Sequence, residues 1–209
     1  MIATETKERP ILFSGPMVRA ILDGRKTQTR RVVKPQPKAP HLGYMATDGG
    51  ALQCGADYPD GDDDFVRCPY GVPGDRLWVR ETWMPFDRDH WVGETRCAYR
   101  ANSSIEGEAI RQEYVSAGRD YRWRPSIHMP RWASRITLEV TDVRVERLQE
   151  IQYPELRREG FEPEGSEHMD PGLACLTKFR STWNQLNADR GFGWDSNPWV
   201  WVVNFKQAT

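Results

Sequence analysis

Apolar and polar residues alternate over several short stretches of the chain, which is the period-two pattern of half-buried β-strands. The clearest stretch is Arg135–Leu148, where the apolar positions of Ile136–Val140 have one parity and Val143 and Val145 have the other. This change of parity near Thr141 predicts a β-bulge or a sharp bend, which curls a sheet toward a barrel. Strands are predicted at 10–13, 29–34, 75–83, 95–101, 134–147 and 199–206.

Helices are predicted between these strands by apolar residues three and four positions apart. The first is expected over 15–23, with Ser14 as its N-cap and Gly24 as the residue that ends it. Two further helices are expected over 151–159 and 173–186. Short helices in irregular order among strands indicate an α+β fold with a small, curled mixed sheet, rather than a doubly wound parallel sheet.

Residues 35–73 have the composition of a long loop, rich in proline, glycine and aspartate and without periodicity. Long loops in compact domains are usually functional or disordered. We therefore interpret 35–73 as an insertion in a single domain that spans 1–209, and a flap over a functional site is one role for it.

The net charge is only −1, but the charges are segregated along the chain. Residues 25–38 carry six positive charges and no carboxylate, whereas 48–64 carry six aspartates and no lysine or arginine. The basic cluster begins where the first helix meets the second strand. A cluster of this kind suits a phosphate or another anion; the alternative is a solvated basic turn.

The four cysteines have no C-x-x-C spacing, which favours reduced thiols in a cytoplasmic protein. A zinc site built from Cys54 and Cys68 with His41 or His90 is the alternative. No apolar stretch approaches the roughly 20 residues that span a bilayer, and no signal-peptide segment opens the chain. We therefore expect a soluble protein without a metal or other cofactor and without membrane contact.

Two glutamates lie where a carboxylate is unfavourable unless it has a partner. Glu81 has the parity of Leu77, Val79 and Trp83 and is predicted to point inward, where it needs a cationic partner or a catalytic role. A Glu–Arg pair that only fixes the fold is the alternative. Glu159 falls in the last turn of a predicted helix, where the dipole disfavours negative charge, so it either pairs with a cation or points into water.

Arginines alternate with aromatic residues over 119–132, and Arg122, Trp123 and Arg124 are the densest part. This composition suits base stacking with phosphate neutralisation. The alternative is an ordinary corner of the fold in which arginine packs on tryptophan.

The stretch GRKTQTRR at 24–31, between a helix and a strand, resembles the ASCH family, a branch of the PUA-like superfamily. The runs PGDRLWVRE at 73–81 and LRREGF at 156–161, and the strand at 199–206, fit the same resemblance. The resemblance implies a small mixed-strand β-barrel flanked by short helices. It also implies a cleft between the barrel and the first helix that holds nucleic acid or a nucleoside.

One branch of this family contains small amidohydrolases that act on N(4)-acetylcytidine. Carried over through the motifs, their catalytic positions are Lys26, Thr29 and Glu159 in this sequence, and Glu81 remains a second candidate carboxylate from its parity. Amide hydrolysis needs a nucleophile, a proton shuttle and stabilisation of an oxyanion. Lys26 would act as a base toward the Thr29 hydroxyl or a water, and Glu159 would protonate the leaving amine.

The expected partner is RNA, or a nucleoside or nucleotide, and the oligomeric state is left open. The residues expected to contact it are Arg25, Thr27, Arg30, Arg31, Arg122, Trp123 and Arg124. Three other functions remain open: an RNA-binding module without catalysis, a metal-independent ribonuclease, and an assembly-associated protein. The last is raised because the length of the chain resembles family variants found in phages and prophages of enteric bacteria.

Overall fold

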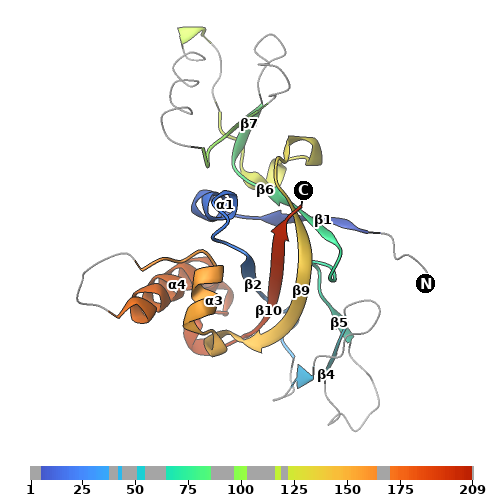
Figure 1. The fold of residues 1–209 in the computed structure, drawn as a ribbon, viewed down its shortest axis with the longest axis vertical. Coiled ribbons are helices and arrows are strands. Elements are labelled where there is room, and N and C mark those ends of the chain that lie inside the picture. The colour runs from blue at the N-terminus through green and yellow to red at the C-terminus, as the bar shows by residue number, and fades with distance from the viewer. Residues whose placement is uncertain are drawn as a thin grey trace.

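A five-stranded mixed sheet forms the centre of the molecule, with the strand order β1-β6-β9-β10-β2 (Figure 1). The computed structural model describes residues 6–37, 42–43, 51–54, 65–85, 97–102, 116–118, 122–163 and 170–208. The central strands are β1 (Glu8–Leu12), β2 (Gln28–Val32), β6 (Arg76–Arg80), β9 (Thr137–Arg147) and β10 (Trp199–Gln207). Only β1 and β6 pair in parallel; the other neighbours are antiparallel. The expected α+β class with a mixed sheet is confirmed.

Strand β9 contains the predicted bulge. Asn204 of β10 pairs with Asp142, but the next residue, Phe205, pairs with Val140, so the register skips Thr141. The extra residue reverses the parity of β9, and therefore Val140 and Val143 both face the same hydrophobic cluster. Strands β1 and β2 occupy the two ends of the pairing order, and among the described residues no pairing joins them.

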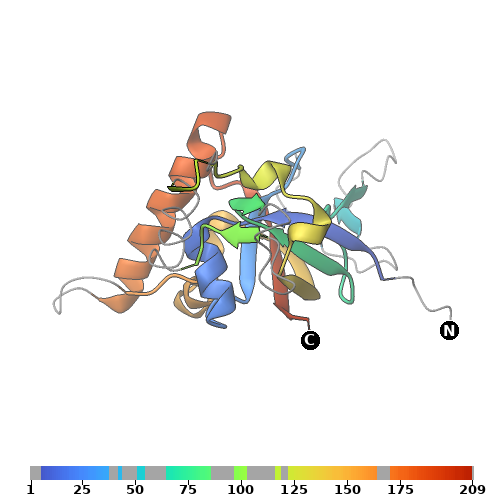
Figure 2. The ribbon, with the colours of Figure 1, turned by 90° about the horizontal axis from the view of Figure 1, so that it is seen from above.

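Helices cover the sheet on both faces (Figures 1 and 2). The helices are α1 (Gly15–Leu22), α3 (Tyr153–Arg158) and α4 (Pro171–Asn187). Residues of α3 and α4 form one hydrophobic cluster with Val200 and Val202 of β10, whereas α1 contributes Val18 and Ile21 to the cluster on the opposite face. This division explains why β10 is apolar on both parities. The short 3-10 helices are Ser126–His128, Arg131–Ala133, Leu148–Glu150, Ala188–Arg190 and Trp194–Ser196.

Ser14 occupies the N-cap position of α1, but its side chain makes no capping hydrogen bond. The predicted N-cap position is therefore correct, but the expected hydrogen bond from the Ser14 side chain to the helix is not formed. One reason is that proline occupies the first turn and has no N–H to offer. Gly24 follows the helix with a φ of 71°, as a residue that ends a helix often does.

Two predictions about strands need correction. The segment 35–73 contains three short strands that form a separate sheet, β3 (Leu42–Gly43), β4 (Ala51–Cys54) and β5 (Phe65–Arg67). Strands of two to four residues are too short to produce a visible period. The strand predicted at 75–83 is broken after β6, and the chain continues in β7 (Trp83–Pro85), which pairs with β8 (Cys97–Tyr99).

Candidate functional site

The basic junction between α1 and β2 is fixed by backbone hydrogen bonds. The N–H groups of Arg25 and Lys26 both donate to the carbonyl of Ala20 at 2.9 Å, which turns the chain back over the end of α1. Thr27 then donates to the carbonyl of Arg158 and accepts from the N–H of Phe205, each at 2.9 Å. The junction is thus tied to the end of α3 and to β10, and this leaves the Lys26 side chain buried.

Lys26 is 3% exposed, and its ammonium has three oxygen acceptors. Nζ donates to the backbone carbonyls of Gln28 and Glu159 at 2.6 and 2.8 Å, and to Glu159 Oε2 at 2.9 Å. Burial lowers the pKa of Lys26 below its ordinary value, while Glu159 opposes this shift and Arg31 and Arg30 reinforce it. Burial thus makes the charged form of Lys26 less favourable than it is in water.

Glu159 forms the C-cap of α3 and is 4% exposed. Gly160 follows it with a φ of 90°, and a Cβ at that position would lie 3.0 Å from Ala20 Cβ and 3.2 Å from Lys26 Cβ. The end of α3 therefore packs directly against the end of α1. The sequence left two readings of Glu159, and the structure corresponds to the paired one rather than to a carboxylate in water.

Arg30 holds the other side of Glu159. Its side chain is fully buried, and its guanidinium contacts Glu159 Oε1 at 3.3 Å, Glu155 Oε2 at 2.8 Å and Glu146 Oε2 at 2.9 Å. Arg144 also pairs with Glu146 and Glu155. Burial raises the pKa of Glu155, but the N–H of Gln152 together with Arg30 and Arg144 outweigh it, so the net shift is downward.

These six charged side chains make a network in which three cations balance three carboxylates: Lys26, Arg30 and Arg144 against Glu146, Glu155 and Glu159. Such a network holds each carboxylate in one position, because moving any member leaves another unpaired. Arg30 therefore acts to position Glu159, and its guanidinium is already neutralised before any ligand binds.

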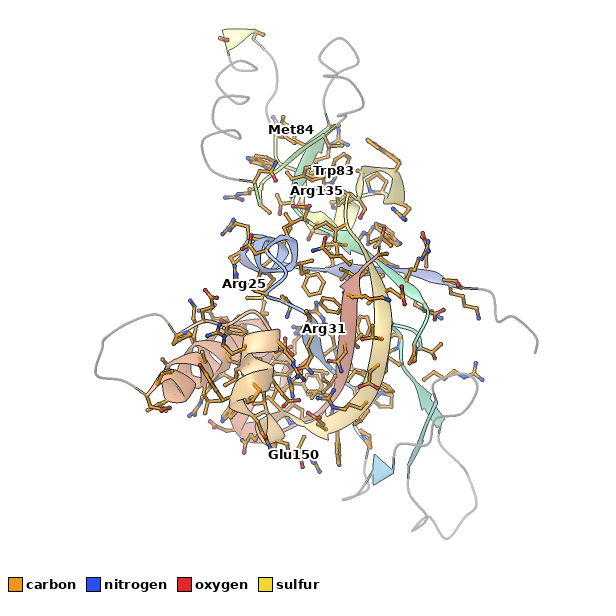
Figure 3. All side chains as sticks on the ribbon, in the orientation of Figure 1. Arg25, Arg31, Trp83, Met84, Arg135 and Glu150 are labelled. Atoms are coloured by element: carbon orange, nitrogen blue, oxygen red, sulfur yellow. The ribbon has the colours of Figure 1, made fainter. Side chains whose placement is uncertain are left out.

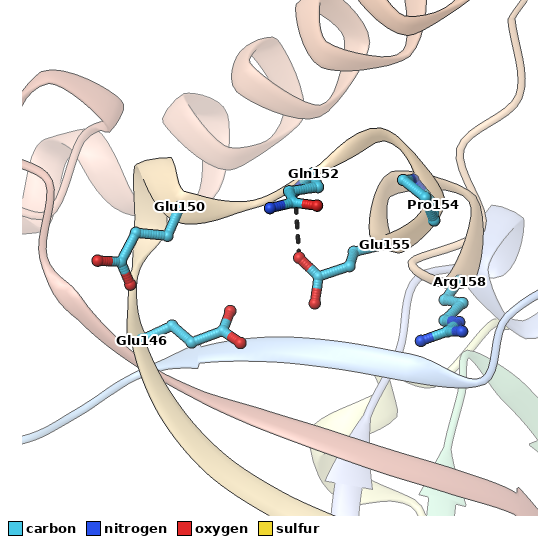
Figure 4. A pocket seen from close by; sticks show the side chains of 6 residues that line it. All are labelled: Glu146, Glu150, Gln152, Pro154, Glu155 and Arg158. Atoms are coloured by element: carbon cyan, nitrogen blue, oxygen red, sulfur yellow. Dashed lines mark hydrogen bonds between the residues drawn. The ribbon is translucent and has the colours of Figure 1, made fainter. Parts of the chain in front are cut away.

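An acidic groove of about 450 Å³ lies on the outer side of this network (Figure 4). Its carboxylates already have structural partners. Glu155 accepts from the backbone N–H of Gln152 at 3.1 Å, and Glu150 accepts from that of Arg147 at 2.9 Å, so both cap short helices. Glu146 is bound to Arg30 and Arg144. We therefore assign this groove to the fold and not to a ligand.

The larger cavity, of about 780 Å³, lies on the inner side and is bounded by β1, β2, α1 and α4. Lys26, Thr29 and Glu159 all line it, together with Arg31. Several aromatic side chains complete its wall: Phe13, Tyr70, Phe161, Phe179, Trp183 and Trp201. Its volume is typical of small-molecule sites, which bury most of a ligand of drug or nucleoside size.

The predicted catalytic residues therefore separate into two groups. Lys26, Thr29 and Glu159 meet in one cavity, although Glu159 is 133 residues from Lys26. Glu81 does not line this cavity; it is 1% exposed and bound by Arg135 through two hydrogen bonds of 2.9 and 3.1 Å. In Figure 3, Arg135 and Arg31 lie apart from each other. The prediction that Glu81 points inward is correct. Its partner is an arginine, as in the alternative in which a Glu–Arg pair only fixes the fold.

The predicted contact residues of the junction are also divided. Arg31 lines the cavity, while Arg25 lies on the surface, where it pairs with Asp23 at 2.7 Å and approaches Glu162 at 4.0 Å. Thr27 serves the junction through its backbone and does not line the cavity. Arg30 is enclosed by the carboxylates described above.

The segment with Arg122, Trp123 and Arg124 lies against β7 and does not line the cavity. Arg124 pairs with Trp83 through the backbone, and its guanidinium lies 5.4 Å from the centre of the Trp83 ring. This contact is the arginine-on-tryptophan packing that the sequence offered as the alternative. Arg122 is exposed and Trp123 is half-buried.

Sequence reasoning missed Glu146, Glu155 and Arg144, which hold the network together, and Tyr70 and Arg190, which line the cavity. One local signal existed: Glu155 and Glu159 are four positions apart, which places them on one face of a helix. No local signal connects either of them to β2 or β9.

The thiol chemistry of the described residues gives no sign of reactivity. Cys68, Cys97 and Cys175 are buried and form no disulfide within the described ranges, and burial raises the pKa of Cys68 to about 11. Of the other members of the alternative zinc site, His41, His90 and the side chain of Cys54 lie outside the described residues. Within the described ranges, no group of three or more histidine, cysteine, aspartate or glutamate side chains is arranged to hold a metal ion.

No protein-family model, curated protein or solved structure matches this chain. Within the part of the chain that the structure describes, no helix has both the length and the hydrophobicity needed to span a membrane.

Proposed function

We propose that this chain is an ASCH-type protein whose 780 Å³ cavity binds a nucleoside and whose Lys26–Glu159 pair hydrolyses an amide of the N(4)-acetylcytidine type. The observation that carries the proposal is the buried 2.9 Å contact between Lys26 Nζ and Glu159 Oε2 at the wall of that cavity. Thr29, the third residue implied by the resemblance, lines the same cavity. Perturbed, buried ionisable pairs in a cavity are typical of acid–base sites.

The fold gives secondary support to the ASCH-type assignment. A small mixed sheet whose long strand contains a bulge is the type of sheet from which a PUA-like barrel is built. The cavity is bounded by this sheet and α1, which is the location that the resemblance implies for nucleic acid or a nucleoside.

The reaction starts with transfer of one proton from the Lys26 ammonium to the Glu159 carboxylate, which gives a neutral amine and a carboxylic acid. The amine then takes a proton from the attacking hydroxyl, either that of Thr29 or that of a water beside it, as oxygen adds to the acyl carbon. Glu159 gives its proton to the leaving nitrogen as the C–N bond breaks. With water, the products are the free amine and a carboxylic acid, and both side chains regain their starting charges; with Thr29, a water then hydrolyses the acyl-enzyme.

Two features of the site favour this proton path. The pKa of Lys26 is lowered by burial, so the neutral amine is more accessible than that of a lysine in water. Arg30 fixes Glu159 Oε1, which leaves Oε2 toward Lys26.

The test is turnover of N(4)-acetylcytidine to cytidine, followed by chromatography, with the wild type and with Lys26→Met, Glu159→Gln and Thr29→Val. Loss of general acid–base catalysis typically lowers the rate by about 10²- to 10⁴-fold. Thr29→Val is the most informative variant, because it removes the hydroxyl at nearly constant volume. Thr29 is uncharged, so the variant leaves the buried ion pairs intact. Glu81→Gln is the matched control, since it alters a buried glutamate outside the cavity.

Absence of turnover by the folded wild type would overturn the hydrolytic part of the proposal. A binder without catalysis would then be indicated if cytidine still protects the protein against thermal unfolding. Retention of full turnover in folded Lys26→Met would remove Lys26 from the mechanism.

A further inference from the structure

The charges that line the 780 Å³ cavity are strongly unbalanced. Its described lining contains one carboxylate, Glu159, and six cations: Lys26, Arg30, Arg31, Lys34, Arg80 and Arg190. Lys26 and Arg30 are neutralised within the buried network. The other four cations have no carboxylate partner among the described residues. The cavity therefore has a positive electrostatic potential, and a neutral nucleoside carries no negative charge to balance it.

Arg31 is the cation best placed to use this potential. Its guanidinium lies 5.2 Å from the centre of the Phe13 ring, and Lys26 Nζ lies 5.6 Å from the same centre. Arg31 is thus a neighbour of the proposed reaction centre without belonging to its ion network. Through Nη2 it donates to the carbonyl of Leu12 at 2.6 Å, which anchors one end of the guanidinium.

Most of the hydrogen-bonding capacity of Arg31 is unused. A guanidinium has five N–H donors, and the described residues accept only from Nη2. Nε is enclosed and has no partner in this part of the structure. Because Nε is enclosed, a ligand in the cavity can bond only to the terminal nitrogens of the guanidinium. The planar guanidinium matches the oxygens of a phosphate, which accept two parallel hydrogen bonds.

Arg190 brings a second unneutralised charge to the same region. It lines the cavity from the end of α4, where Nη2 donates to the carbonyl of Leu186 and to Asn187 Oδ1, the latter at 3.0 Å. These bonds hold the side chain at the C-terminus of the helix. Burial lowers the pKa of Arg31; Tyr70 and Glu159 oppose this shift, and the nearby charge of Arg190 reinforces it. Two such cations repel each other unless an anion lies between them.

We propose that Arg31 and Arg190 form a phosphate subsite in this cavity, so that the substrate is a nucleotide with a terminal phosphate monoester rather than a free nucleoside. This assignment rests on the proposed function, because it presumes that the base lies at Lys26 and Glu159. The cavity volume of about 780 Å³ is of the size that accommodates a ligand as large as one nucleotide.

The test separates binding from catalysis. Calorimetry at low ionic strength, in a buffer without phosphate, compares cytidine with cytidine 5′-monophosphate for the wild type, Arg31→Gln and Arg190→Gln. Two charge-assisted hydrogen bonds predict that the monophosphate binds about 10- to 100-fold tighter than cytidine to the wild type. Each variant should lose most of this preference. Arg180→Gln, on an exposed part of α4 where Arg180 pairs with Asp195 at 3.0 Å, should retain it.

The kinetic arm compares N(4)-acetylcytidine with its 5′-monophosphate, and the ratio of the two kcat/KM values should fall in both cavity variants. If the wild type binds the monophosphate more tightly than cytidine, the two variants lose this preference and neither acetylated compound is hydrolysed, the subsite is supported and only the hydrolysis is overturned. Turnover of the nucleoside without tighter binding of the monophosphate overturns the subsite and leaves the proposed function intact. Tighter, arginine-dependent binding of a cytidine-containing oligonucleotide than of the monophosphate overturns the assignment to a terminal monoester.

Discussion

Glu159 binds the ammonium of Lys26 twice, through its backbone carbonyl at 2.8 Å and through its carboxylate at 2.9 Å. The carbonyl belongs to the last turn of α3, where unpaired carbonyls carry a partial negative charge. Lys26 therefore satisfies the helix terminus and the carboxylate together. This explains how a glutamate is tolerated at the end of a helix, where the dipole alone would disfavour it.

The first prediction concerns the energetic coupling of this pair. Glu159→Gln should lower the free energy of unfolding by about 3–5 kcal/mol, because it leaves the buried ammonium without a carboxylate. Lys26→Met should cost less, because Arg30 still pairs with Glu159 Oε1 at 3.3 Å. The double variant should cost clearly less than the sum of the two. Urea unfolding of all four proteins measures the coupling directly.

The control for this cycle is the exposed pair of Lys206 and Glu139, whose charged atoms lie 3.1 Å apart. Exposed ion pairs typically contribute about 0.2–1 kcal/mol, so the cycle of Lys206→Met and Glu139→Gln should show only a small coupling. Additive costs for Lys26→Met and Glu159→Gln would mean that the buried contact contributes no more than this surface pair.

The second prediction concerns Gly160, which allows α3 to approach α1. Gly160→Ala should destabilise the protein by more than backbone strain alone, since its Cβ would lie 3.0 Å from Ala20 Cβ and 3.2 Å from Lys26 Cβ. Gly74 has a similar φ of 95°, but a Cβ there meets nothing within 4 Å. Gly74→Ala should therefore show only the strain, of order 1–3 kcal/mol. Thermal unfolding compares the two variants, and equal losses would contradict the close contact at Gly160.

The sequence predicted those features whose signal is local. The bulge at Thr141 was visible because it reverses the parity of neighbouring apolar residues within one strand. The burial of Glu81 was visible for the same reason. Strands β3 to β5 were not visible, because each is too short to establish a period.

Partners that are distant in sequence could not be predicted from pattern. Glu159 is 133 residues from Lys26, and Glu81 is 54 residues from Arg135, so neither pairing leaves a periodic trace. Only the resemblance to a family motif connected Lys26 with Glu159. It did not reveal that Arg30 is enclosed by Glu146 and Glu155, because these partners come from β9 and α3.

The third prediction separates Glu81 from the candidate active site. Glu81→Gln should lower the free energy of unfolding by about 1–3 kcal/mol, since it removes the charge of a buried carboxylate whose partner, Arg135, is partly exposed. The specific activity of the folded fraction toward N(4)-acetylcytidine should not change, because Glu81 does not line the cavity. Activity normalised by circular dichroism measures this. A loss of kcat in fully folded Glu81→Gln would return Glu81 to the list of catalytic candidates.

The last prediction concerns the dependence of stability on pH. Although burial favours the neutral acid, the N–H of Gln152 and the guanidinium groups of Arg30 and Arg144 lower the pKa of Glu155 below its ordinary value of 4.5. A carboxyl whose pKa is lower in the folded protein stabilises it above the unfolded pKa, and this contribution is lost as the pH falls through the folded pKa. The wild type should therefore lose stability as the pH falls below 4.5, and Glu155→Gln should lose less over that interval.

Melting temperatures measured from pH 7 to pH 3 test this expectation, and the curves of the two proteins should converge toward the acidic end. Glu150→Gln is the matched control, because Glu150 caps the neighbouring 3-10 helix but has no ion pair among the described residues. Its acid dependence should follow the wild type. Parallel curves for the wild type and Glu155→Gln would show that the contacts of Glu155 with Arg30 and Arg144 do not stabilise its charged form, and the network around Glu159 would then owe its order to packing alone.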